Sequence, residues 1–361
     1  MRIASDNIDA RGEWRTTERP GQGQLEGMIL RRCSVRLTAM AIVAAMFVAG
    51  ATKQASAYTL VGTAGLASDA FWISLMCGGT KAAEAAGSRI DWYTVNNAAD
   101  AAENMANYEA LRIANPDGVV MSLLSTEPPP GYVKGLMAHG VPVVYVGGLP
   151  ATDRSYLAGF RSAPADDKMK KVADMIIADT DGTGQMAVLG GIAGLSPVLD
   201  ARWKVLKRVL AKAAPCLEIL PTQYDGFDVN TANALVSALI VANPKLKVVY
   251  TVSGPEGEGA VAAIRAAGMS GKIVVYSFDA VPALQQGIRD GTVRALIAQP
   301  AALLGEEAVK RVIAYLDMHM RREPVLPDVA DQDREFDTVI ITKANIDSRS
   351  VQGYLYQNQC K

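Results

Sequence analysis

The sequence predicts an α/β fold made of two lobes, each built on a parallel sheet covered by helices. Short apolar strands alternate with longer amphipathic helices from Tyr58 onward, and Gly, Pro, Asn and Asp mark the turns between them. This alternation begins a second time at about residue 167. Two similar α/β lobes in one chain account for the repetition, and a single large sheet is the alternative.

The expected strands and helices of the first lobe lie within residues 58–146. Turn signals support its boundaries, because Asn115-Pro116-Asp117-Gly118 precedes one strand and Gly140-Val141-Pro142 precedes another. The expected strands are Thr59–Thr63, Ile90–Val95, Gly118–Leu123 and Val143–Val146, and the expected helices are Ala70–Ala86, Ala98–Ala114 and Tyr132–His139.

The second lobe repeats the pattern, and Asn243-Pro244 precedes a strand as Asn115-Pro116 does in the first. Its expected strands are Gln185–Leu189, Glu218–Leu220, Val248–Thr251, Lys272–Tyr276 and Val293–Ala298. Its expected helices are Asp167–Thr180, Leu199–Ala213, Val229–Asn243, Gly257–Ala267 and Val281–Asp290.

Composition excludes several classes of function. The 361 residues carry 36 Lys+Arg against 37 Asp+Glu, so a broad basic face for nucleic acid is not expected. His139 and His319 are the two histidines, which argues against His-based metal sites and Ser-His-Asp or Cys-His catalysis. The four cysteines form no CxxC pair, so no zinc ribbon or thioredoxin motif is expected.

The N-terminal segment predicts export. A segment starting at Met28 carries three arginines and then an apolar, small-residue stretch, Leu37 to Ala51. Ala55-Ser56-Ala57 is an A-x-A cleavage signal, so we expect a signal peptide at about 28–57 and a mature chain that begins at Tyr58. A retained membrane anchor is the alternative, but the apolar stretch is short for one. Residues 1–27 carry no usable pattern, and Met28 is the expected initiator.

Functional residues are expected just after strands, because open α/β sheets bind ligands at the carboxyl ends of their strands. Asp69, Phe71 and Trp72 follow the first strand. Aromatic rings stack on the C–H faces of sugars, and an ionised Asp accepts hydrogen bonds from hydroxyls. The alternative is that both rings belong to the lobe core and Asp69 caps the helix.

Polar and aromatic residues also follow strands of the second lobe. Asp279 ends one strand, with the N-cap of the next helix as its alternative role, and Gln299 ends another and supplies both a donor and an acceptor. Phe227 is adjacent to Asp228 between a strand and a helix. Arg202 lies in a helical stretch, where a solvated helix face is the alternative.

Together these segments resemble the periplasmic sugar-binding proteins of the ribose-binding type, the substrate receptors of ABC importers. The resemblance covers Tyr58 to about Ile341 and includes Gly190-Gly191-Ile192-Ala193-Gly194 and Ile297-Ala298-Gln299-Pro300. It implies a type I periplasmic binding fold of two Rossmann-like lobes, joined by a three-segment hinge with the ligand cleft between them. The implied lobes are residues 58–160 plus 300–326, and 161–299 plus 327–361.

The resemblance also implies the ligand-binding residues. They are Asp69, Phe71 and Trp72 from the first lobe, Arg202, Phe227, Ser253 and Asp279 from the second, and Gln299 at the hinge. Ser253 stands where relatives often carry Asn, and Gly147-Gly148 stands where they often carry an Asp-Arg pair. The loss of two charged groups removes strong hydrogen bonds and argues against ribose itself as the ligand.

The implied function is capture of a small sugar or polyol and its delivery to a membrane ABC permease. The protein is expected to be a periplasmic monomer without cofactor, metal or enzymatic activity. A periplasmic sensor subunit that docks on a histidine kinase or chemoreceptor is the alternative. A glycosidase pair of Asp69 and Asp279 would lie on opposite lobes, and Gly190–Gly194 lacks the G-x-G-x-x-G spacing of a dinucleotide loop.

Export leaves Cys77, Cys216 and Cys360, which permit one disulfide in an oxidising compartment. A bridge to Cys360 would fix the C-terminal tail. Shared lobe membership favours Cys216–Cys360, although the sequence leaves the connectivity open.

Overall fold

The computed structural model describes residues 57–98, 100–123, 127–150, 152–194, 197–319, 322–326 and 333–360. The expected signal peptide lies outside these residues, apart from Ala57 at its end. Within the described ranges, no helix combines the length and the apolar character that a bilayer crossing requires.

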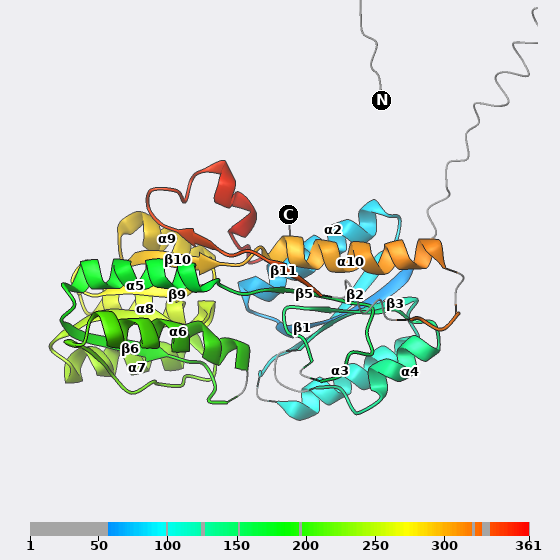
Figure 1. The fold of residues 1–361 in the computed structure, drawn as a ribbon, viewed down its shortest axis with the longest axis horizontal. Helices are drawn as coiled ribbons and strands as arrows, with labels where there is room; N and C mark the ends of the chain where they lie inside the picture. The colour runs from blue at the N-terminus through cyan, green and yellow to red at the C-terminus, as the bar shows by residue number, and fades with distance from the viewer. Residues whose placement is uncertain are drawn as a thin grey trace, which may run out of the picture. The chain divides into compact units, whose positions relative to one another are not determined.

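The first sheet has six strands in the order β11-β5-β4-β3-β1-β2, and every neighbouring pair is parallel. The strands are β1 (Thr59–Leu66), β2 (Arg89–Val95), β3 (Gly118–Ser122), β4 (Val143–Val146), β5 (Ala158–Ser162) and β11 (Asp333–Phe336). Helices α2 (Ala70–Ala85) and α10 (Ala301–Met318) pack together on one face, and α3 (Ala101–Ala114) and α4 (Tyr132–Ala138) cover the other (Figure 1).

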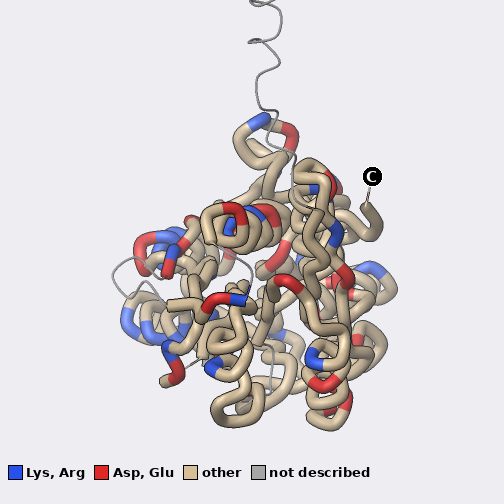
Figure 2. The backbone as a smooth tube through the Cα atoms, turned by 90° about the vertical axis from the view of Figure 1, so that its right-hand side faces the viewer, with Lys and Arg blue, Asp and Glu red and all other residues tan. Residues whose placement is uncertain are grey.

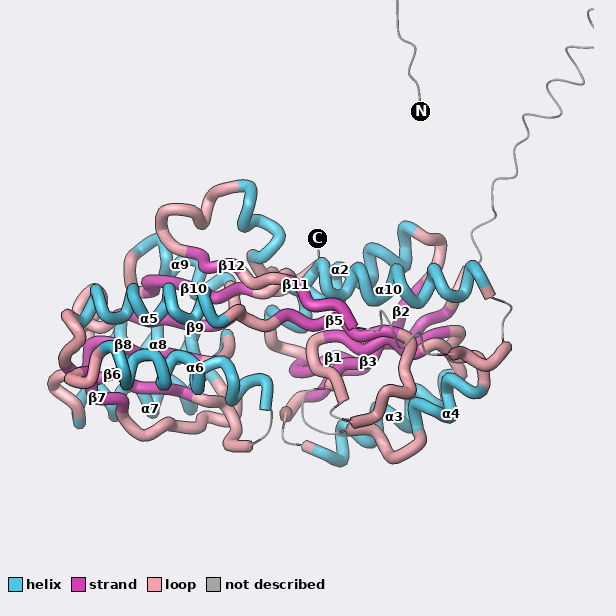
Figure 3. Tube along the Cα trace, viewed as in Figure 1, coloured by secondary structure: helices cyan, strands magenta, loops and turns pink. Residues whose placement is uncertain are grey.

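The second sheet also has six strands, in the order β12-β10-β9-β8-β6-β7. They are β6 (Gly184–Leu189), β7 (Leu217–Ile219), β8 (Leu246–Thr251), β9 (Val274–Phe278), β10 (Val293–Ala298) and β12 (Val339–Ile341), of which β12 alone pairs antiparallel. Its helices are α5 (Asp166–Thr180), α6 (Pro197–Ala213), α7 (Val229–Ala242), α8 (Gly254–Ala266), α9 (Pro282–Asp290) and the 3₁₀ helix η1 (Arg349–Tyr354). Helices α5 and α6 pack together, as do α7 and α8 (Figure 3).

The predicted fold class is therefore confirmed, with two parallel-dominated sheets. The central strands show why the strands could be predicted from the sequence. All four residues of β4 are buried apolar side chains, as expected for a strand covered on both faces.

Five elements were not predicted: β5, α10, β11, β12 and η1. The sheet pairing also corrects one lobe boundary. The sequence places residues 327–361 in the second lobe, but β11 pairs in parallel with β5 of the first sheet. The chain consequently passes between the sheets at residues 163–165, 299–300 and 337–338.

The disulfide also differs from the favoured pairing, because Cys360 bonds to Cys77 of α2 and Cys216 is an exposed free thiol. The C-terminal tail explains the difference. After η1 the tail runs toward α2, where the backbone N–H of Gln357 donates to Ser74 Oγ at 2.9 Å. Cys360 therefore reaches the first helix of the chain instead of the second lobe.

Charged residues of both signs are interspersed along the described chain in the view of Figure 2. Many of them form exposed pairs, such as Arg89 with Asp91 at 2.8 Å and Lys170 with Asp174 at 2.8 Å. Such pairs contribute little to stability, so the buried charges described below carry more information about function.

Candidate functional site

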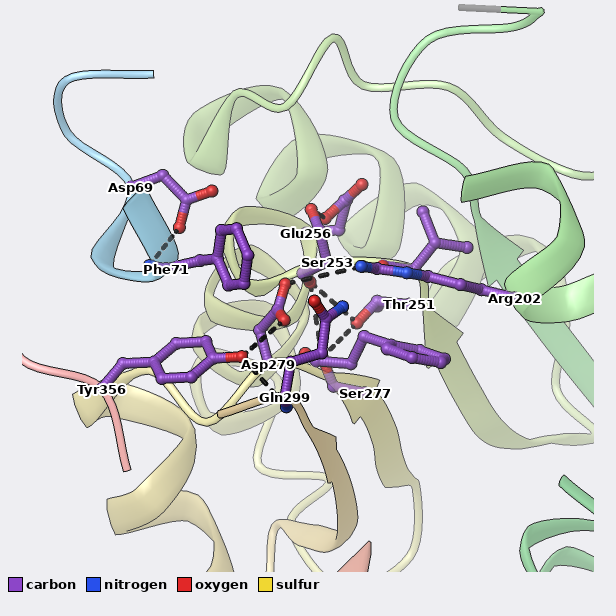
Figure 4. A network of polar contacts seen from close by, with 12 residues as sticks. Asp69, Phe71, Arg202, Thr251, Ser253, Glu256, Ser277, Asp279, Gln299 and Tyr356 are labelled. Carbon is purple, nitrogen blue, oxygen red and sulfur yellow. Dashed lines mark hydrogen bonds and ion pairs between the residues drawn. The ribbon is translucent and has the colours of Figure 1, made fainter. Parts of the chain in front are cut away.

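Strand ends and the C-terminal tail bring a buried polar cluster together. Figure 4 shows ten of its members: Asp69, Phe71, Arg202, Thr251, Ser253, Glu256, Ser277, Asp279, Gln299 and Tyr356. Six of the eight predicted site residues belong to this group. Trp72 touches Phe71 of the group, and the backbone N–H of Phe227 donates to Asp225, which lies outside the ten.

Of the two roles that the sequence left open for Asp69, the structure shows the capping role. It is the N-cap of α2, where its Oδ1 accepts a hydrogen bond from the Phe71 backbone N–H at 3.0 Å. Burial and the nearby carboxylate of Asp279 raise the pKa of Asp69 to about 7. A capping residue thus also faces the acidic group of the second lobe.

The two aromatic residues after Asp69 are buried and touch edge to face, with ring centroids 4.9 Å apart. Phe71 reaches the tail, where its centroid lies 5.7 Å from that of Tyr356. Trp72 packs beside Gly65 and Gly147. An added Cβ would lie 2.3 Å from the indole at Gly65 and 3.5 Å from it at Gly147. Trp72 is therefore part of the first-lobe core as well as a neighbour of the cluster.

Gly147 and Gly148, for which the resemblance implies an Asp-Arg pair in relatives, have a packing role in this structure. Gly147 has a φ of +81° and faces the Trp72 ring. A Cβ on Gly148 would lie 2.4 Å from the carbonyl oxygen of Leu123. A side chain at 148 would thus clash with backbone before it could reach a ligand.

Asp279 is the centre of the second-lobe contribution. Its backbone has a φ of +69°, a conformation that non-glycine residues adopt mostly where the surroundings enforce it. The N-cap of α9 is Val281, so the capping role considered for Asp279 is not the one observed. Its Oδ1 accepts from Tyr356 Oη at 3.1 Å, and its Oδ2 lies 3.7 Å from Arg202 Nη1.

The pKa of Asp279 is raised, because burial outweighs the opposing effects of Arg202, Tyr356 and the Gly254 backbone N–H. The carboxyl is therefore held in an environment that penalises its charge.

Arg202 is buried and not on a solvated helix face. Its Nη1 donates to the Val252 carbonyl at 2.7 Å, and its guanidinium carbon lies 4.4 Å from the centroid of the Phe278 ring. The plane of the guanidinium is thereby fixed beside Asp279.

Ser253 and Glu256 open α8 with the S-x-x-E pattern of a capping box. Ser253 Oγ donates to Glu256 Oε2, and Glu256 is completely buried. Burial and the nearby Asp225 carboxylate raise the pKa of Glu256 well above its ordinary range. The predicted residue Ser253 is therefore hydrogen-bonded to a further buried acid.

Phe227 lies at the edge of the cluster. Its backbone φ is +63°. Its ring packs against Gly191, where an added Cβ would lie 2.3 Å from the ring. Its backbone N–H donates to Asp225 Oδ1 at 2.8 Å. Burial raises the pKa of Asp225 to about 7, so this loop brings another acid near Glu256.

Gln299 lies where the chain passes between the two sheets and contacts the C-terminal tail. Its backbone N–H donates to Tyr356 Oη at 3.2 Å, and that hydroxyl in turn donates to Asp279. The Gln299 side chain is buried, and its Nε2 has no partner among the described residues. A bound molecule that offers an acceptor would satisfy it.

Sequence reasoning missed Tyr356, Glu256 and Asp225. The S-x-x-E pattern that begins at Ser253 was a sequence signal for Glu256, although the Ser253 side chain makes no capping hydrogen bond to the backbone. Tyr356 had no such sequence signal, because it follows no strand and reaches the cluster only through the path of the C-terminal tail.

A cavity of about 650 Å³ lies in the first lobe, away from these residues. Its lining includes Tyr132, His139 and Arg322 and none of the predicted site residues. The polar cluster remains the candidate site, because it combines the strand ends, the buried charges and an unpartnered donor.

Comparison with known proteins connects the fold to a family. The model of the periplasmic binding protein domain family matches residues 63–319. A D-ribose/D-allose-binding protein of Pseudomonas aeruginosa is 31% identical over 114 residues, which are 32% of this chain and 36% of that protein. The ribose import binding protein RbsB of Escherichia coli is 26% identical over 244 residues, 66% of this chain and 78% of that one.

Solved structures share the same fold. An ABC transporter solute-binding protein of Agrobacterium vitis, bound with α-D-tagatopyranose, has a TM-score of 0.71 at 22% identity, covering 83% of this chain and 99% of its own. A carbohydrate transporter solute-binding protein of Agrobacterium radiobacter, in complex with D-arabinose, has a TM-score of 0.71 at 18% identity with the same coverage. With the family model matching more than two thirds of its length, the chain belongs to the periplasmic binding protein domain family.

Proposed function

We propose that this protein is an exported solute-binding protein that captures a small sugar-like molecule and delivers it to a membrane ABC importer. Family membership and the ribose- and allose-binding relatives support the assignment. In this proposal the molecule is bound and released without chemical change, and no cofactor or metal takes part.

One observation carries the proposal. Side chains after strand ends of the second sheet form a buried group that holds fixed acceptors, a fixed guanidinium and an unpartnered amide donor. Asp69 and Phe71, after the first strand of the first sheet, lie close to Asp279 and Tyr356 of this group. Sugar hydroxyls both donate and accept hydrogen bonds, so a polyol matches such a mixed set. Phe71 adds an apolar face for the C–H surface of a sugar ring.

The two lobes are proposed to close on the ligand. Asp69 and Phe71 precede the first chain passage between the sheets, whereas Arg202 and Asp279 follow it. Since each lobe supplies part of the contacts, the ligand binds the closed arrangement best and shifts the population toward it. Gln299 lies at the second passage and is proposed to act as the hinge contact.

A thermal-shift screen of the mature chain against pentoses, hexoses and polyols tests the proposal. A ligand at a hundred times its Kd adds about 2.7 kcal/mol to the free energy of unfolding, enough to raise Tm measurably. Stabilisation by a sugar or polyol, followed by loss of its uptake when the gene is deleted, supports the function. A screen in which no sugar or polyol stabilises the protein contradicts it.

A further inference from the structure

We propose that the natural solute carries a protonated amine in addition to hydroxyl groups. This proposal specifies the ligand class of the candidate site and rests on the proposed function. The cluster holds more carboxyl groups than its basic residue balances. The Asp279 carboxylate raises the pKa of both Asp69 and Glu256, and the Asp225 carboxylate also raises that of Glu256. Burying several acids together is unfavourable unless a cation joins them or they take up protons.

The basic side chain of the cluster is already engaged. Arg202 donates to the Val252 carbonyl, stacks on Phe278 and stays 3.7 Å from Asp279. A distance of 3.7 Å is longer than a charge-assisted hydrogen bond, so Arg202 only partly compensates Asp279. The charged groups that act most on Glu256 are the carboxylates of Asp225 and Asp279, and both raise its pKa.

Buried polar atoms without partners point to a missing donor. Glu256 is 0% exposed, and its Oε1 has no hydrogen-bond partner among the described residues. Asp225 is 4% exposed, and its Oδ2 also lacks a hydrogen-bond partner there. Such atoms are costly unless a bound group satisfies them. An ammonium group supplies three donors and a positive charge, which matches acceptors that a neutral hydroxyl serves less well.

Gln299 provides an independent sign that a ligand group is missing from the cluster. Its side chain is 3% exposed, its Nε2 has no partner, and Figure 4 shows its amide directed toward the side chains of Asp279 and Arg202. An amide donor selects an acceptor such as a hydroxyl oxygen. The ligand therefore combines an ammonium group for the carboxylates with hydroxyl groups for Gln299.

Binding of a cation should release protons. The titratable and charged groups that face the cluster are Asp69, Asp225, Glu256, Glu258, Asp279, Tyr356 and Arg202. A positive charge placed among these acids lowers their pKa values, so carboxyls that are protonated near neutral pH lose protons to the buffer. A neutral polyol lacks this effect.

Matched ligand pairs test the inference by titration calorimetry at pH 7. The pairs are N-methyl-D-glucamine with D-sorbitol, and 6-amino-6-deoxy-D-glucose with D-glucose. We expect the amine of at least one pair to bind at least about tenfold more tightly than its neutral partner, the size of one charge-assisted hydrogen bond. We also expect its apparent heat to differ between phosphate and Tris buffers in the sense of proton release.

Asp69→Asn and Asp279→Asn should each reduce the preference for the amine to within about threefold, and Asn at 69 keeps the N-cap. The exposed acid Asp347, which pairs with Arg289, gives the charge-matched control Asp347→Asn, with the preference expected to persist. Equal or tighter binding of the neutral partners overturns the inference and leaves the proposed function intact. Binding of no member of either pair also overturns it, and the wider sugar screen then decides the proposed function separately.

Discussion

The hydroxyl of Tyr356 donates a hydrogen bond to Asp279 Oδ1 at 3.1 Å and accepts one from the backbone N–H of Gln299 at 3.2 Å. One residue of the C-terminal tail thus joins the acid at the end of β9 to the hinge residue after β10. The same ring lies beside Phe71 of the first lobe. Tyr356 therefore holds the orientation of Asp279 in the candidate site.

Tyr356→Phe should weaken both ligand binding and the fold. The change removes the hydroxyl and leaves a buried carboxylate oxygen and a buried backbone N–H without their partner, at a cost of about 1–3 kcal/mol. Chemical denaturation measures the loss of stability, and calorimetry with the screened ligand measures the loss of affinity. Tyr354→Phe, two residues earlier in the chain and outside the Asp279 contact, is the control. Unchanged affinity in Tyr356→Phe would show that Asp279 is oriented by other groups.

The Cys77–Cys360 disulfide should stabilise the tail and with it the position of Tyr356. Cys360→Ser is expected to lower the free energy of unfolding by about 2–5 kcal/mol, because the bridge closes a loop spanning most of the mature chain. Cys216→Ser, at the exposed free thiol, should leave stability unchanged. Thiol counting of the denatured mature protein should give one thiol, and a count of three would disprove the bridge.

Stability should fall as the pH rises from about 4 to about 7. The pKa of Asp225 is raised from 3.8 to about 7, so between these values the folded chain binds a proton that the unfolded chain has released. The free energy of unfolding therefore decreases over this window, by at most about 1.4 kcal/mol per pH unit for each such proton. Asp69 acts in the same direction.

Asp225→Asn should flatten this pH profile, because the amide no longer titrates while its oxygen still accepts from Phe227. Thermal unfolding of the variant, the parent and Asp347→Asn at several pH values provides the comparison. A slope that is equally steep in Asp225→Asn and the parent would show that Asp225 is ionised throughout.

Gly148→Ala should destabilise the protein by about 1–3 kcal/mol, since its Cβ would press on the Leu123 carbonyl oxygen and the backbone would have to move. Gly135→Ala is the matched control. Gly135 lies inside α4 with open space around its Cβ position, so alanine should stabilise by about 0.5–1 kcal/mol. Denaturation midpoints of the two variants should move in opposite directions, and a shift of both in the same direction would contradict the packing account.

The sequence predicted the two-lobe fold because buried parallel strands such as Val143–Val146 and their turn signals are local features. Sheet membership of β11 was not predictable, since only its pairing with a distant strand, β5, decides it. The same holds for Cys360, whose partner depends on the course of the tail.

The candidate site shows the same division. Asp69, Asp279 and Gln299 were found because they follow strands, and the general rule for α/β sheets applies to them. Tyr356 was missed because nothing local marks it. Trp72 was predicted as a contact residue, and its packing on Gly65 and Gly147 adds a core role that only the folded chain reveals.

A crystal structure of the mature protein with the ligand from the screen tests the central claim most directly. We expect the ligand to lie within hydrogen-bond distance of Asp279 and Arg202 from the second lobe and to contact Asp69 or Phe71 from the first. Gln299 Nε2 should donate to it. A ligand bound in the first-lobe cavity beside Tyr132 and His139, or held by one lobe alone, would contradict the assignment of this site.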